Sequence, residues 1–432
     1  MKSPGSAKLS FEAVLAHLAQ LSENRGIRYD LGPVQAALTE LGLTDISIPT
    51  VQVAGTNGKG STVWGIAAVL QHLGHRVGVF TSPHIESYTE RIGINGSAIS
   101  EADFMAAFTA ISPVANRYQL TEFEALTLMG MHYFKQQKPD YLILETGMGG
   151  RLDATTAVKS DLAVITRIGK DHMAILGNTL SKIASEKAGI IRPNTPVVVG
   201  PQSKKVKAVF EATASARKSP IYFSKPIKIV PAIKIPYQQE NWGTVKTAID
   251  VLLQGKGTAA LSTVLAHTTG FWGRFTVIQS RSGTVVIDGA HNSNGLRQLK
   301  RGLTRAFPGR PIHLILGILA TKDAKSMLKI AATITQNISY CDFDPGKSVP
   351  FSEIQSLSPF PIQSLNGGRS KRAHIRNFSL PADYQGAAPQ RGGVVKGSEN
   401  CEDACFLNGH NAITVFSGSL YFIAKLHSMK WT

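Results

Sequence analysis

The stretch Val-Gln-Val-Ala-Gly-Thr-Asn-Gly-Lys-Gly-Ser-Thr, residues 51–62, decides the fold, because it predicts a short apolar strand that runs into a glycine loop. Its glycines let the backbone approach an anion closely, and the apolar run of residues 63–73 predicts a helix whose first N–H groups point at that anion. Lys59 would add a positive charge for outer phosphates, and Ser61 or Thr62 a hydroxyl for Mg²⁺. The spacing departs from the general Walker pattern, so a structural turn is the alternative. The order of strand, loop, lysine, hydroxyls and helix favours a nucleotide-phosphate site.

The composition is that of an ordinary globular protein, with 43% hydrophobic and 17% charged residues over 432 positions. This length has room for two domains or three. No run approaches the roughly 18 apolar residues that cross a bilayer, and the first residues lack the apolar stretch of a secretory signal. The three cysteines cannot form a disulfide framework, and Cys401 and Cys405 with His410 fall short of the four ligands of a closed zinc site. We therefore expect a cytoplasmic protein without a membrane partner, and we also expect a monomer.

The formal net charge of +17 raises the question of a nucleic-acid partner. Basic residues gather between positions 201 and 240, where the acidic residues are Glu211 and Glu240. The basic residues are Lys204, Lys205, Lys207, Arg217, Lys218, Lys225, Lys228 and Lys234. Few aromatic side chains for base stacking lie among them, so we predict a solvated basic face and no nucleic-acid partner. A field that draws in anionic substrates is the alternative.

Apolar strands alternate with helices along most of the chain, which predicts an α/β fold with a mostly parallel sheet covered on both faces. Besides the strand before the glycine loop, the predicted strands of the first half are residues 77–80, 141–145, 162–166 and 196–200. A second alternation begins with a strand at 284–287 and a helix at 295–305. We predict an N-terminal P-loop-type ATPase domain, residues 1–271, and a smaller C-terminal Rossmann-like α/β domain, residues 276–432. Residues 363–409 read as a low-complexity insertion in the second domain.

Polar segments directly follow several predicted strands, and ligands of parallel sheets sit at the carboxyl ends of strands. The segments are residues 55–62, 81–84, 145–153 and 167–172. Glu145 ends a buried strand, where a carboxylate is costly unless it is paired or binds a metal. Mg²⁺ beside a triphosphate is the predicted partner of Glu145, and a core arginine is the alternative. Asp171 and His172 follow another strand, although imidazole is an unusual Mg²⁺ ligand.

Two further motifs place polar side chains at the ends of predicted elements. Lys187 lies in the last turn of a predicted helix. It would either complement the helix dipole or, beside carboxylates and metal, take up CO₂ as a carbamate. Asp288 and His291 follow the first strand of the second domain, in the position of a ligand-facing loop. The alternative for Asp288 and Asn292 is helix capping.

Together these motifs resemble those of the folylpolyglutamate synthase and dihydrofolate synthase family, within the Mur-ligase-like superfamily. The matching segments occur in the family's order and cover nearly the whole chain. They are Gly-Thr-Asn-Gly-Lys-Gly-Ser (55–61), Thr-Ser-Pro-His (81–84), Thr-Glu-Phe-Glu (121–124), Glu-Thr-Gly-Met-Gly-Gly-Arg-Leu-Asp-Ala-Thr (145–155), Asp-His (171–172), Glu-Lys-Ala-Gly-Ile (186–190), Gly-Arg-Phe (273–275), Asp-Gly-Ala-His-Asn (288–292) and Gly-Ser-Leu-Tyr (418–421).

The resemblance implies an ATP-dependent amide ligase of folate biosynthesis that joins L-glutamate to dihydropteroate and to folate glutamates. ATP would phosphorylate the carboxylate, and the glutamate amine would attack the resulting acyl phosphate. The implied cofactors are ATP, two Mg²⁺ ions, a CO₂-derived carbamate on Lys187, and K⁺. The implied partners are small-molecule substrates only. Metal ions and Lys59 would neutralise the charge on the transferring phosphoryl group.

The resemblance also implies a set of site residues, carried over motif by motif. The implied catalytic residues are Lys59, His172, Lys187, Asp288 and His291. The implied ATP-binding residues are Thr56, Asn57, Gly58, Lys59, Gly60, Ser61, Asn241, Arg274 and Asp288, and the implied Mg²⁺ ligands are Ser82, Glu145 and His172. The implied substrate-binding residues are Arg28, Tyr29, Asp30, Leu31, Thr121, Glu122, Phe123, Glu124, Leu152 and Asp153. Two positions depart from the family pattern, since Thr156 stands in place of an asparagine and Thr321 in place of an aspartate.

Three other functions stay open. A monofunctional folylpolyglutamate synthase would share all these motifs. A Mur-type ligase of cell-wall synthesis would need a separate domain for a UDP-sugar, and the stretch before Val51 is too short to form one. A P-loop nucleotide-binding or nucleic-acid-binding protein without ligase activity would leave Glu145, His172 and Lys187 unexplained.

Overall fold

The structure is a computed structural model, and it describes residues 10–26, 28–84, 86–227, 235–267, 273–280, 283–344, 346–365, 395–396 and 412–423. Cys401, Cys405 and His410, the alternative metal ligands, lie outside the described residues, as does most of the predicted insertion. The chain forms two compact units. Unit 1 comprises residues 1–168, 180–225 and 244–260, and unit 2 comprises residues 169–179, 226–243 and 261–432.

Unit 1 is built on an eight-stranded sheet in the order β4-β3-β2-β5-β1-β6-β7-β8. Its strands are β1 (Thr50–Ala54), β2 (Val77–Phe80), β3 (Ile92–Ile94), β4 (Ser97–Ala98), β5 (Tyr141–Glu145), β6 (Leu162–Ile165), β7 (Val197–Val199) and β8 (Ile221–Phe223). The strands from β2 to β8 pair in parallel, while β3 and β4 form an antiparallel edge. The predicted mostly parallel sheet is confirmed. Because β2, β5, β1 and β6 are successive neighbours, the four polar segments that follow them start at one edge of the sheet.

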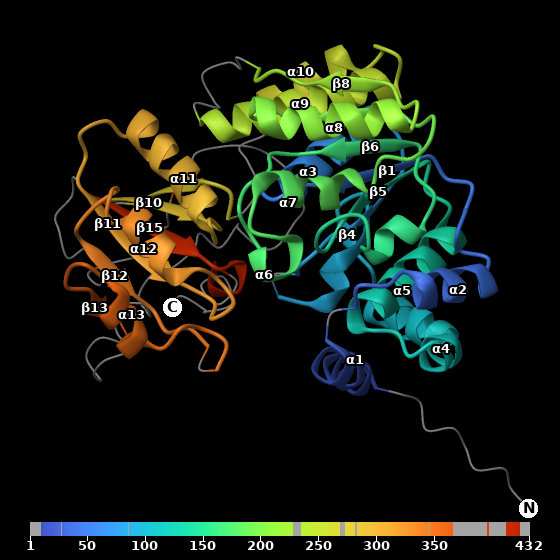
Figure 1. Cartoon of the computed structure of the whole chain (residues 1–432), viewed down its shortest axis with the longest axis horizontal. Coiled ribbons are helices and arrows are strands. Elements are labelled where there is room, and N and C mark those ends of the chain that lie inside the picture. The colour runs from blue at the N-terminus through green and yellow to red at the C-terminus, as the bar shows by residue number, and fades with distance from the viewer. Residues whose placement is uncertain are drawn as a thin grey trace, which may run out of the picture. The chain divides into compact units, whose positions relative to one another are not determined.

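The helices of unit 1 are α1 (Phe11–Arg25), α2 (Gly32–Glu40), α3 (Lys59–His72), α4 (Glu101–Arg117), α5 (Glu122–Gln137), α7 (Leu180–Ala188) and α8 (Lys204–Ala216), with short 3₁₀ turns η1 (Tyr88–Arg91) and η2 (Ala154–Ala157). Side chains of Ser10, Ser100 and Thr121 accept backbone N–H bonds as N-caps, which sets where α1, α4 and α5 begin. Helices α1, α2, α4 and α5 lie together in Figure 1 and share one apolar core with Leu142 and Leu144 of β5.

Helix α3 begins at Lys59, four residues before the predicted start at position 63. Gly58 ends the loop with a φ of 91°, and the N–H of Thr62 already donates to the carbonyl of Gly58 at 3.0 Å. Gly60 and Ser61 therefore lie in the first helical turn. The apolar run that suggested the start marks the buried face of α3, not its first residue.

Unit 2 contains a seven-stranded sheet in the order β13-β12-β11-β15-β10-β9-β14. Its strands are β9 (Thr276–Ser280), β10 (Gly283–Asp288), β11 (Ile312–Gly317), β12 (Ile338–Tyr340), β13 (Gln363–Ser364), β14 (Val395–Lys396) and β15 (Ile413–Gly418). The pairing is parallel except between β9 and β10. The described parts of the predicted insertion, residues 363–364 and 395–396, pair as edge strands. The insertion itself stays a prediction.

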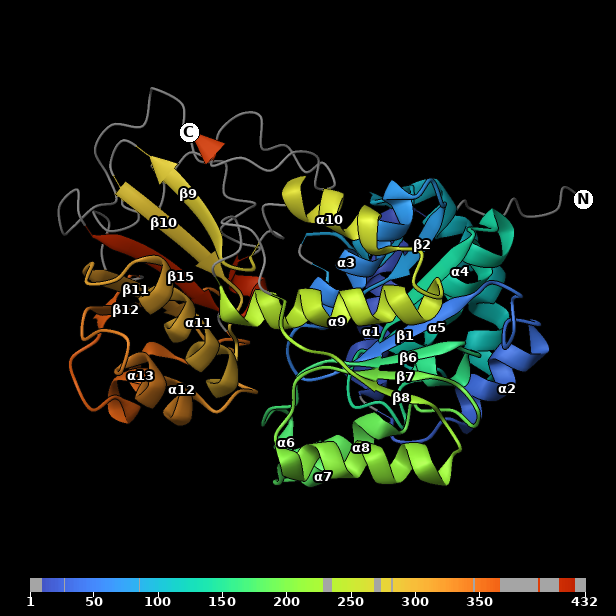
Figure 2. The same ribbon diagram turned by 90° about the horizontal axis from the view of Figure 1, so that it is seen from above.

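Helices α11 (Ser293–Ala306), α12 (Ala324–Ala331) and α13 (Phe351–Leu357) lie on one face of this sheet, as Figure 2 shows. They bury Leu299, Leu328 and Ile354 against Val286 and Leu314 of the strands. The other face holds a second apolar cluster that includes Phe343, Phe416 and Phe422. A two-domain α/β fold with a second, smaller alternation of strands and helices is thereby confirmed.

Several elements escape prediction for reasons of length or composition. Strands β3, β4, β8, β13 and β14 have only two or three residues, too few for an apolar run. Strand β9 and helix α13 show only a weak alternation of apolar and polar residues. Helix α8 carries mostly small and basic residues on its exposed side. Their existence depends on pairing or packing with longer elements.

The remaining helices are α6 (Met173–Leu176) in unit 2, and α9 (Pro236–Leu252) and α10 (Thr258–His267), which each contribute residues to both units. Helix α9 begins at Pro236. The predicted domain boundary at residues 271–276 stays a prediction, because the chain passes between the compact units at several points. Among the described residues, no helix combines the length and apolar character needed to span a membrane.

Replacing Gly55 with alanine tests the tight junction between the phosphate loop and β6. An added Cβ would lie 1.7 Å from Thr166 Oγ1, so we expect Gly55→Ala to lower the free energy of unfolding by at least about 2 kcal/mol in urea titration. Gly74→Ala is the matched control, since Gly74 also has a positive φ, 88°, but has no atom within 4 Å of an added Cβ. It should cost only about 1 kcal/mol. Equal losses in the two variants would contradict the packing argument.

Candidate active site

The phosphate loop of unit 1 is anchored to the neighbouring strand end. The N–H groups of Thr56 and Asn57 donate to the carbonyl of Arg167 at 3.0 and 3.3 Å. Gly58 follows in a left-handed conformation as the N-cap of α3, so the first N–H groups of the helix face the loop. The predicted cradle therefore has the backbone form that binds phosphate in other helix N-termini.

Lys59 and Glu145 form the charged pair of this site. Nζ of Lys59 lies 3.9 Å from Oε1 of Glu145. Glu145 is only 4% exposed, so its carboxylate needs a nearby cation to remain ionised. The end of β5 and the start of α3 are thus joined by opposite charges.

Two buried hydroxyls near this pair in the sequence have no hydrogen-bond partner among the described residues. They are Oγ1 of Thr62, in the first turn of α3, and Oγ1 of Thr146, next to Glu145. Both residues are 0% exposed. Unpaired buried hydroxyls are rare, and hydroxyl and carboxylate oxygens are the donors that Mg²⁺ and its waters prefer. The residues present therefore fit a nucleotide phosphate with Mg²⁺.

A neutral histidine stands in the segment after β2, which also holds the half-buried Ser82. Nδ1 of His84 accepts a hydrogen bond from Nε of Arg91 at 2.9 Å, so its proton lies on Nε2. Burial lowers the pKa of His84 to about 4, and the charge of Arg91 acts in the same direction. Arg91 also lies 3.8 Å from Glu122, one of the predicted substrate residues.

The glycine-rich loop after β5 is held by Asp153. The Asp153 carboxylate accepts from the N–H of Met148 at 2.9 Å, and from the N–H and hydroxyl of Thr155 at 3.1 and 2.6 Å. Burial raises the pKa of Asp153, and these hydrogen bonds oppose the rise. Its carboxylate shapes the loop, and its predicted contact with substrate stays a prediction.

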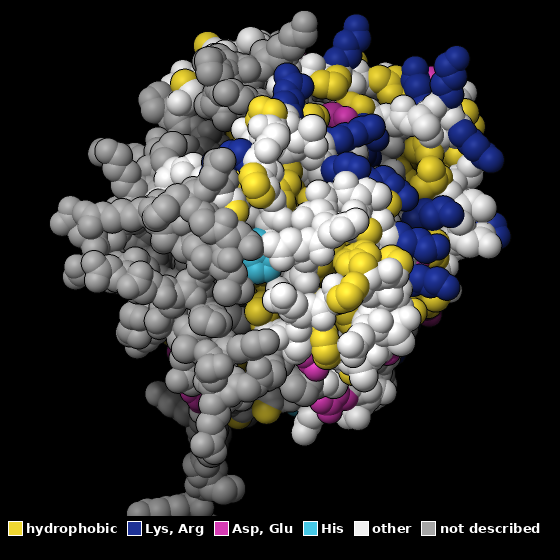
Figure 3. All heavy atoms as spheres, turned by 90° about the vertical axis from the view of Figure 1, so that its left-hand side faces the viewer, with side chains coloured by type: hydrophobic (Ala, Val, Ile, Leu, Met, Phe, Trp, Pro, Cys, Tyr) yellow, Lys and Arg dark blue, Asp and Glu magenta, His cyan; other side chains and the backbone are white. Residues whose placement is uncertain are grey.

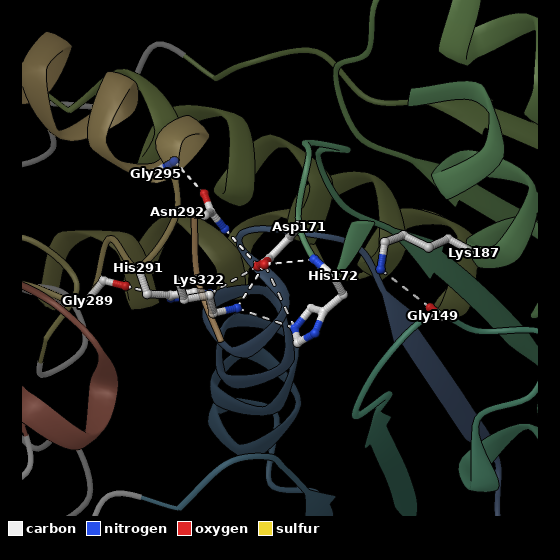
Figure 4. A network of polar contacts seen from close by, with 9 residues as sticks. All are labelled: Gly149, Asp171, His172, Lys187, Gly289, His291, Asn292, Gly295 and Lys322. Atoms are coloured by element: carbon white, nitrogen blue, oxygen red, sulfur yellow. Dashed lines mark hydrogen bonds and ion pairs between the residues drawn. The ribbon is translucent and has the colours of Figure 1, made fainter. Parts of the chain in front are cut away.

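Lys187 lies against the same loop. Its side chain is buried at the end of α7, and Nζ lies 3.5 Å from the carbonyl of Gly149, as Figure 4 shows. Gly189 keeps α7 close, since an added Cβ there would lie 2.3 Å from Cα of Arg151. A buried amine facing loop carbonyls differs from the exposed lysine of an ordinary helix C-terminus.

Thr156, where the family pattern has asparagine, ties the loop to β1. Its hydroxyl donates to the carbonyl of Gly150 at 2.7 Å and accepts from Nε2 of Gln52 at 2.8 Å. Arg192 donates to the Thr156 carbonyl at 2.5 Å. The Thr156 side chain therefore bridges the loop and β1.

Two of the predicted substrate segments meet in unit 1. Nη1 of Arg28 lies 3.7 Å from Oε2 of Glu124, and Thr121 and Glu124 form a capping box at the start of α5. The Phe123 ring packs on Gly147, where an added Cβ would lie 2.7 Å from it. The other predicted residues do not converge in this way: Tyr29 is 46% exposed, Asp30 accepts from the N–H of Gly32, Leu31 is the N-cap of α2, and Leu152 is half-buried.

Unit 2 contains a polar cluster centred on Asp171, shown in Figure 4. Oδ1 of Asp171 accepts from Nζ of Lys322 at 2.8 Å and from the N–H of His172 at 3.0 Å. Oδ2 accepts from Nδ2 of Asn292 at 2.9 Å and lies 3.5 Å from Nε2 of His291. One carboxylate thus joins the segment after β6 to the segments after β10 and β11.

The charge state of this cluster follows from its donors. Burial acts to raise the pKa of Asp171, but the hydrogen bond with His291 and the charges of Lys322 and the histidines hold it well below its usual range. Burial lowers the pKa of His291, although the interaction with Asp171 opposes this. Nδ1 of His291 donates to the carbonyl of Gly289 at 2.9 Å. Asp171 is therefore the fixed negative charge of the cluster at neutral pH.

The Asp288 carboxylate bonds a tyrosine side chain and not the backbone N–H groups at the start of α11. Tyr237 donates to its Oδ2 at 2.7 Å, and burial raises the pKa of Asp288. Asn292 accepts from the N–H of Gly295 at 2.8 Å, so the capping alternative is confirmed for Asn292 and wrong for Asp288. Arg274 packs on Gly289, where an added Cβ would lie 2.6 Å from its Nη1.

The predicted Mg²⁺ ligands are distributed over both units, since Ser82 and Glu145 belong to unit 1 and His172 to unit 2. Within the part of the chain that the structure describes, no group of three or more His, Cys, Asp or Glu side chains is placed to hold a metal by itself. The three-residue ligand set stays a prediction. The same holds for Asn241, which lies in the second turn of α9 and is half-buried.

Neither Lys322 nor Tyr237 is among the site residues predicted from the sequence. Lys322 follows β11 closely, so the rule that placed the other polar segments at strand ends would have found it. Tyr237 lies in the first turn of α9, far in sequence from Asp288, and no local pattern indicates that contact.

The Asp171 cluster predicts a large effect of removing its charge. Asp171→Asn should lower the free energy of unfolding by about 3 kcal/mol or more, because Lys322 would be left buried without its counter-ion. Glu211→Gln is the control, since it breaks an exposed pair with Lys207 at 3.4 Å and should change stability by less than about 1 kcal/mol. Urea titration of both variants at pH 7 measures the difference, and similar effects would contradict the assigned role of Asp171.

The pKa of His84 predicts a pH dependence of stability. Because its pKa is lower in the folded chain than the ordinary 6.5, the unfolded chain binds the proton first as the pH falls. Stability should therefore decline between pH 6.5 and about 4, by about 1–2 kcal/mol between pH 7 and pH 5. His84→Gln keeps an acceptor for Arg91 and should remove this part of the decline in urea titrations. An unchanged decline in His84→Gln would show that other groups cause it.

Comparison with known proteins agrees with this geometry. The family model described as Mur ligase middle domain matches residues 53–241, and that described as Mur ligase, glutamate ligase domain matches residues 273–357. The sequence is 31% identical to the dihydrofolate synthase/folylpolyglutamate synthase of Bacillus subtilis, over 93% of this chain and 95% of that protein. It is 32% identical to the probable dihydrofolate synthetase of Schizosaccharomyces pombe, over 76% of this chain and 84% of that protein.

Solved structures extend the likeness to the whole fold. The bifunctional folylpolyglutamate synthase/dihydrofolate synthase of Yersinia pestis, complexed with AMPPNP and Mn ion, superposes with a TM-score of 0.81 at 25% identity, covering 99% of each chain. Escherichia coli FolC in complex with DHPP and ADP gives a TM-score of 0.79 at 25% identity, covering 96% of each chain. With both sequence and fold matched over nearly its full length, the chain belongs to the dihydrofolate synthase/folylpolyglutamate synthase family of Mur-type ligases.

Proposed function

We propose that this protein is an ATP-dependent ligase that adds L-glutamate to dihydropteroate and to folate glutamates through an acyl phosphate. The observation that carries the proposal is the buried Glu145 beside Lys59, at the first turn of a helix that follows a glycine loop. A fixed cation and a carboxylate at a helix N-terminus are the groups that hold a nucleotide phosphate with its metal. Bound Mg²⁺ would neutralise charge on the transferring phosphoryl group.

Different residues of unit 1 would bind the phosphates, the metal and the pterin. Thr56 to Ser61 and the helix N-terminus would hold the phosphates, while Glu145 and the unpaired hydroxyls of Thr62 and Thr146 would take the metal and its waters. Arg28 lies beside Glu124, and Phe123 packs on Gly147 of the glycine-rich loop. These three residues would bind the pterin end of the substrate. The aromatic ring of Phe123 supplies a flat apolar surface suited to a fused ring.

The residues of unit 2 suit an amino acid with two carboxylates. Asp171 holds the ammonium group of Lys322 in place. A carboxylate of glutamate could therefore bind to Lys322 without the lysine side chain first having to become ordered. Arg274, with Asp288 and Tyr237 behind it, and Asn241 would contact the nucleotide. His172 would complete the metal ligands Ser82 and Glu145. The enzyme would act in the cytoplasm as a monomer.

A phosphate-release assay tests the proposal. The protein is incubated with ATP, Mg²⁺ and K⁺, with or without L-glutamate, and with dihydropteroate or tetrahydrofolate. Phosphate release that requires glutamate and occurs with either pterin supports the bifunctional ligase. Glutamate-dependent release with tetrahydrofolate but not with dihydropteroate indicates a monofunctional folylpolyglutamate synthase. Release without glutamate or pterin would instead indicate a simple NTPase. Lys59→Met should abolish release in every case.

Lys187 is proposed to carry a carbamate that serves as an anionic oxygen ligand. Its burial and the 3.5 Å contact with the Gly149 carbonyl support this, because a buried amine next to a metal site gains from conversion to an anion. Lys187→Ala should lower turnover by at least about 100-fold, the size of effect expected when a single charge-stabilising group is lost. Partial rescue by a short-chain carboxylic acid is expected in the assay above. Full activity of the variant would exclude the role.

A further inference from the structure

A buried glutamine, Gln52, lies in the middle of β1, between the parallel strands β5 and β6. Polar side chains at the surface, such as the Lys and Arg side chains that gather along one border of the face in Figure 3, are hydrated by water. Gln52 is 0% exposed, so its amide depends on partners inside the protein. The proposed function gives this amide no role.

The NH₂ group of Gln52 bonds two neighbouring threonines of the 3₁₀ turn η2. Nε2 donates to Oγ1 of Thr155 at 3.0 Å and to Oγ1 of Thr156 at 2.8 Å. The Thr156 hydroxyl donates its own proton to the carbonyl of Gly150, which can only accept, so from Gln52 it can only receive a hydrogen bond. One amide therefore holds two hydroxyls, and each hydroxyl leads to a different part of the glycine-rich loop.

The two hydroxyls reach the residues on either side of Gly149. The hydroxyl of Thr155 donates to Oδ1 of Asp153 at 2.6 Å, and Oδ2 of the same carboxylate accepts from the N–H of Met148 at 2.9 Å. The second hydroxyl donates to the carbonyl of Gly150 at 2.7 Å. The residues before and after Gly149 are therefore both tied to the same side chain of β1.

The backbone of Gly149 lies in the left-handed region, with a φ of 68°, which glycine enters without strain but also leaves easily. Its carbonyl lies 3.5 Å from Nζ of Lys187, and Figure 4 shows the lysine amine directed at it. The loop also touches the end of α7, because an added Cβ on Gly150 would lie 2.8 Å from the carbonyl of Glu186. A shift of the loop would therefore move the acceptor that faces Lys187.

The Gln52 amide adds little to the stability of the fold. Its oxygen, Oε1, is buried and has no hydrogen-bond partner among the described residues. An acceptor buried without a partner costs about as much free energy as one or two hydrogen bonds gain. An apolar side chain of the same length would avoid that cost. The main effect of Gln52 is therefore the geometry that its N–H groups impose on the loop.

We propose that Gln52 is a positioning residue for Lys187. Through the two threonine hydroxyls it fixes the Gly149 carbonyl against the lysine amine. The inference rests on the proposed function, in which Lys187 takes up CO₂. There the neutral amine attacks the carbon of CO₂, an N–C bond forms as one C=O double bond becomes single, and one proton leaves the nitrogen for water. The N–H that remains donates to the Gly149 carbonyl, so Gln52 sets the direction in which the carbamate oxygens point.

Acetylation of lysine amines tests the position of Lys187 without depending on turnover. The full-length protein is treated with acetic anhydride in CO₂-free buffer, and the rate at each lysine is measured by mass spectrometry of its peptides. Gln52→Met keeps the length of the side chain and removes both N–H donors. We expect it to raise the rate at Lys187 about tenfold, since each lost hydrogen bond is worth a few-fold. The rate at Lys59, in the same unit, and the urea midpoint should stay unchanged.

Matched variants separate the hydroxyl paths from general loosening. Thr156→Val removes one path without changing the shape of the side chain and should raise the rate at Lys187 about threefold, whereas Thr156→Ser keeps the hydroxyl and should leave the rate unchanged. Thr50→Val removes another buried polar group of β1, whose hydroxyl donates to the Ile48 carbonyl at 2.7 Å and not to the loop, and it should also have no effect. If Gln52→Met fails to fold, the two Thr156 variants decide.

The phosphate-release assay adds a readout that general destabilisation would not give. Gln52→Met should lower kcat about tenfold, because the lysine is misplaced, and should change KM for ATP by less than about twofold. The phosphate loop is held separately, since the N–H groups of Thr56 and Asn57 donate to the carbonyl of Arg167. Thr156→Ser should restore kcat relative to Thr156→Val.

The outcomes separate the two proposals. No turnover of any pterin by the unchanged protein would overturn the proposed function, and the acetylation rates would still decide the role of Gln52. Equal rates at Lys187 in the unchanged protein and in Gln52→Met would overturn that role, as would an unchanged kcat in an active enzyme. Equal rises at Lys59 and Lys187 with a lower urea midpoint would overturn it as well, because Gln52 would then only stabilise the unit.

Discussion

The attraction between the buried carboxylate of Glu145 and the ammonium of Lys59 is the constraint on which unit 1 depends. A carboxylate at the end of an apolar parallel strand is unstable without a cation, and Lys59 supplies one at 3.9 Å from the neighbouring helix start. Glycines 55 and 58 allow the loop between β1 and α3 to turn tightly enough to place that lysine. Close to this pair in the sequence, the buried hydroxyls of Thr62 and Thr146 have no hydrogen-bond partner among the described residues.

Unit 2 also contains a buried carboxylate, but there several donors surround a single acceptor. There one carboxylate, Asp171, is shared by Lys322, Asn292 and His291, so three loops from different strands are joined through a single acceptor. Burial alone would favour the neutral acid, but the surrounding donors keep Asp171 ionised. The negative charge in turn fixes the position of Lys322, which leaves a preorganised cation for an anionic ligand.

Glycine-rich segments serve packing as much as ligand approach. Gly147 admits the ring of Phe123, and Gly189 allows α7 to lie against Arg151. The loop between β5 and η2 is thereby enclosed by side chains from several elements, with Asp153 and Thr156 bonded within it and to β1. Its conformation is set by many weak contacts, among them the hydrogen bonds of the Thr156 hydroxyl with Gly150 and Gln52.

Periodicity and motif order in the sequence determined the α/β class, the long strands and the set of strand-end loops, because apolar runs and glycines act locally. They also placed Lys59 and Glu145 in loops at one edge of the sheet, since parallel strands bring their carboxyl ends together. The sequence predicted Mg²⁺ or a core arginine as the partner of Glu145, and the structure shows Lys59 at 3.9 Å. Only the tertiary structure decided that Tyr237 bonds Asp288, that Lys322 pairs with Asp171, and that α3 starts at Lys59. These contacts join residues far apart in the chain or depend on one backbone angle, and short-range patterns carry no information about either.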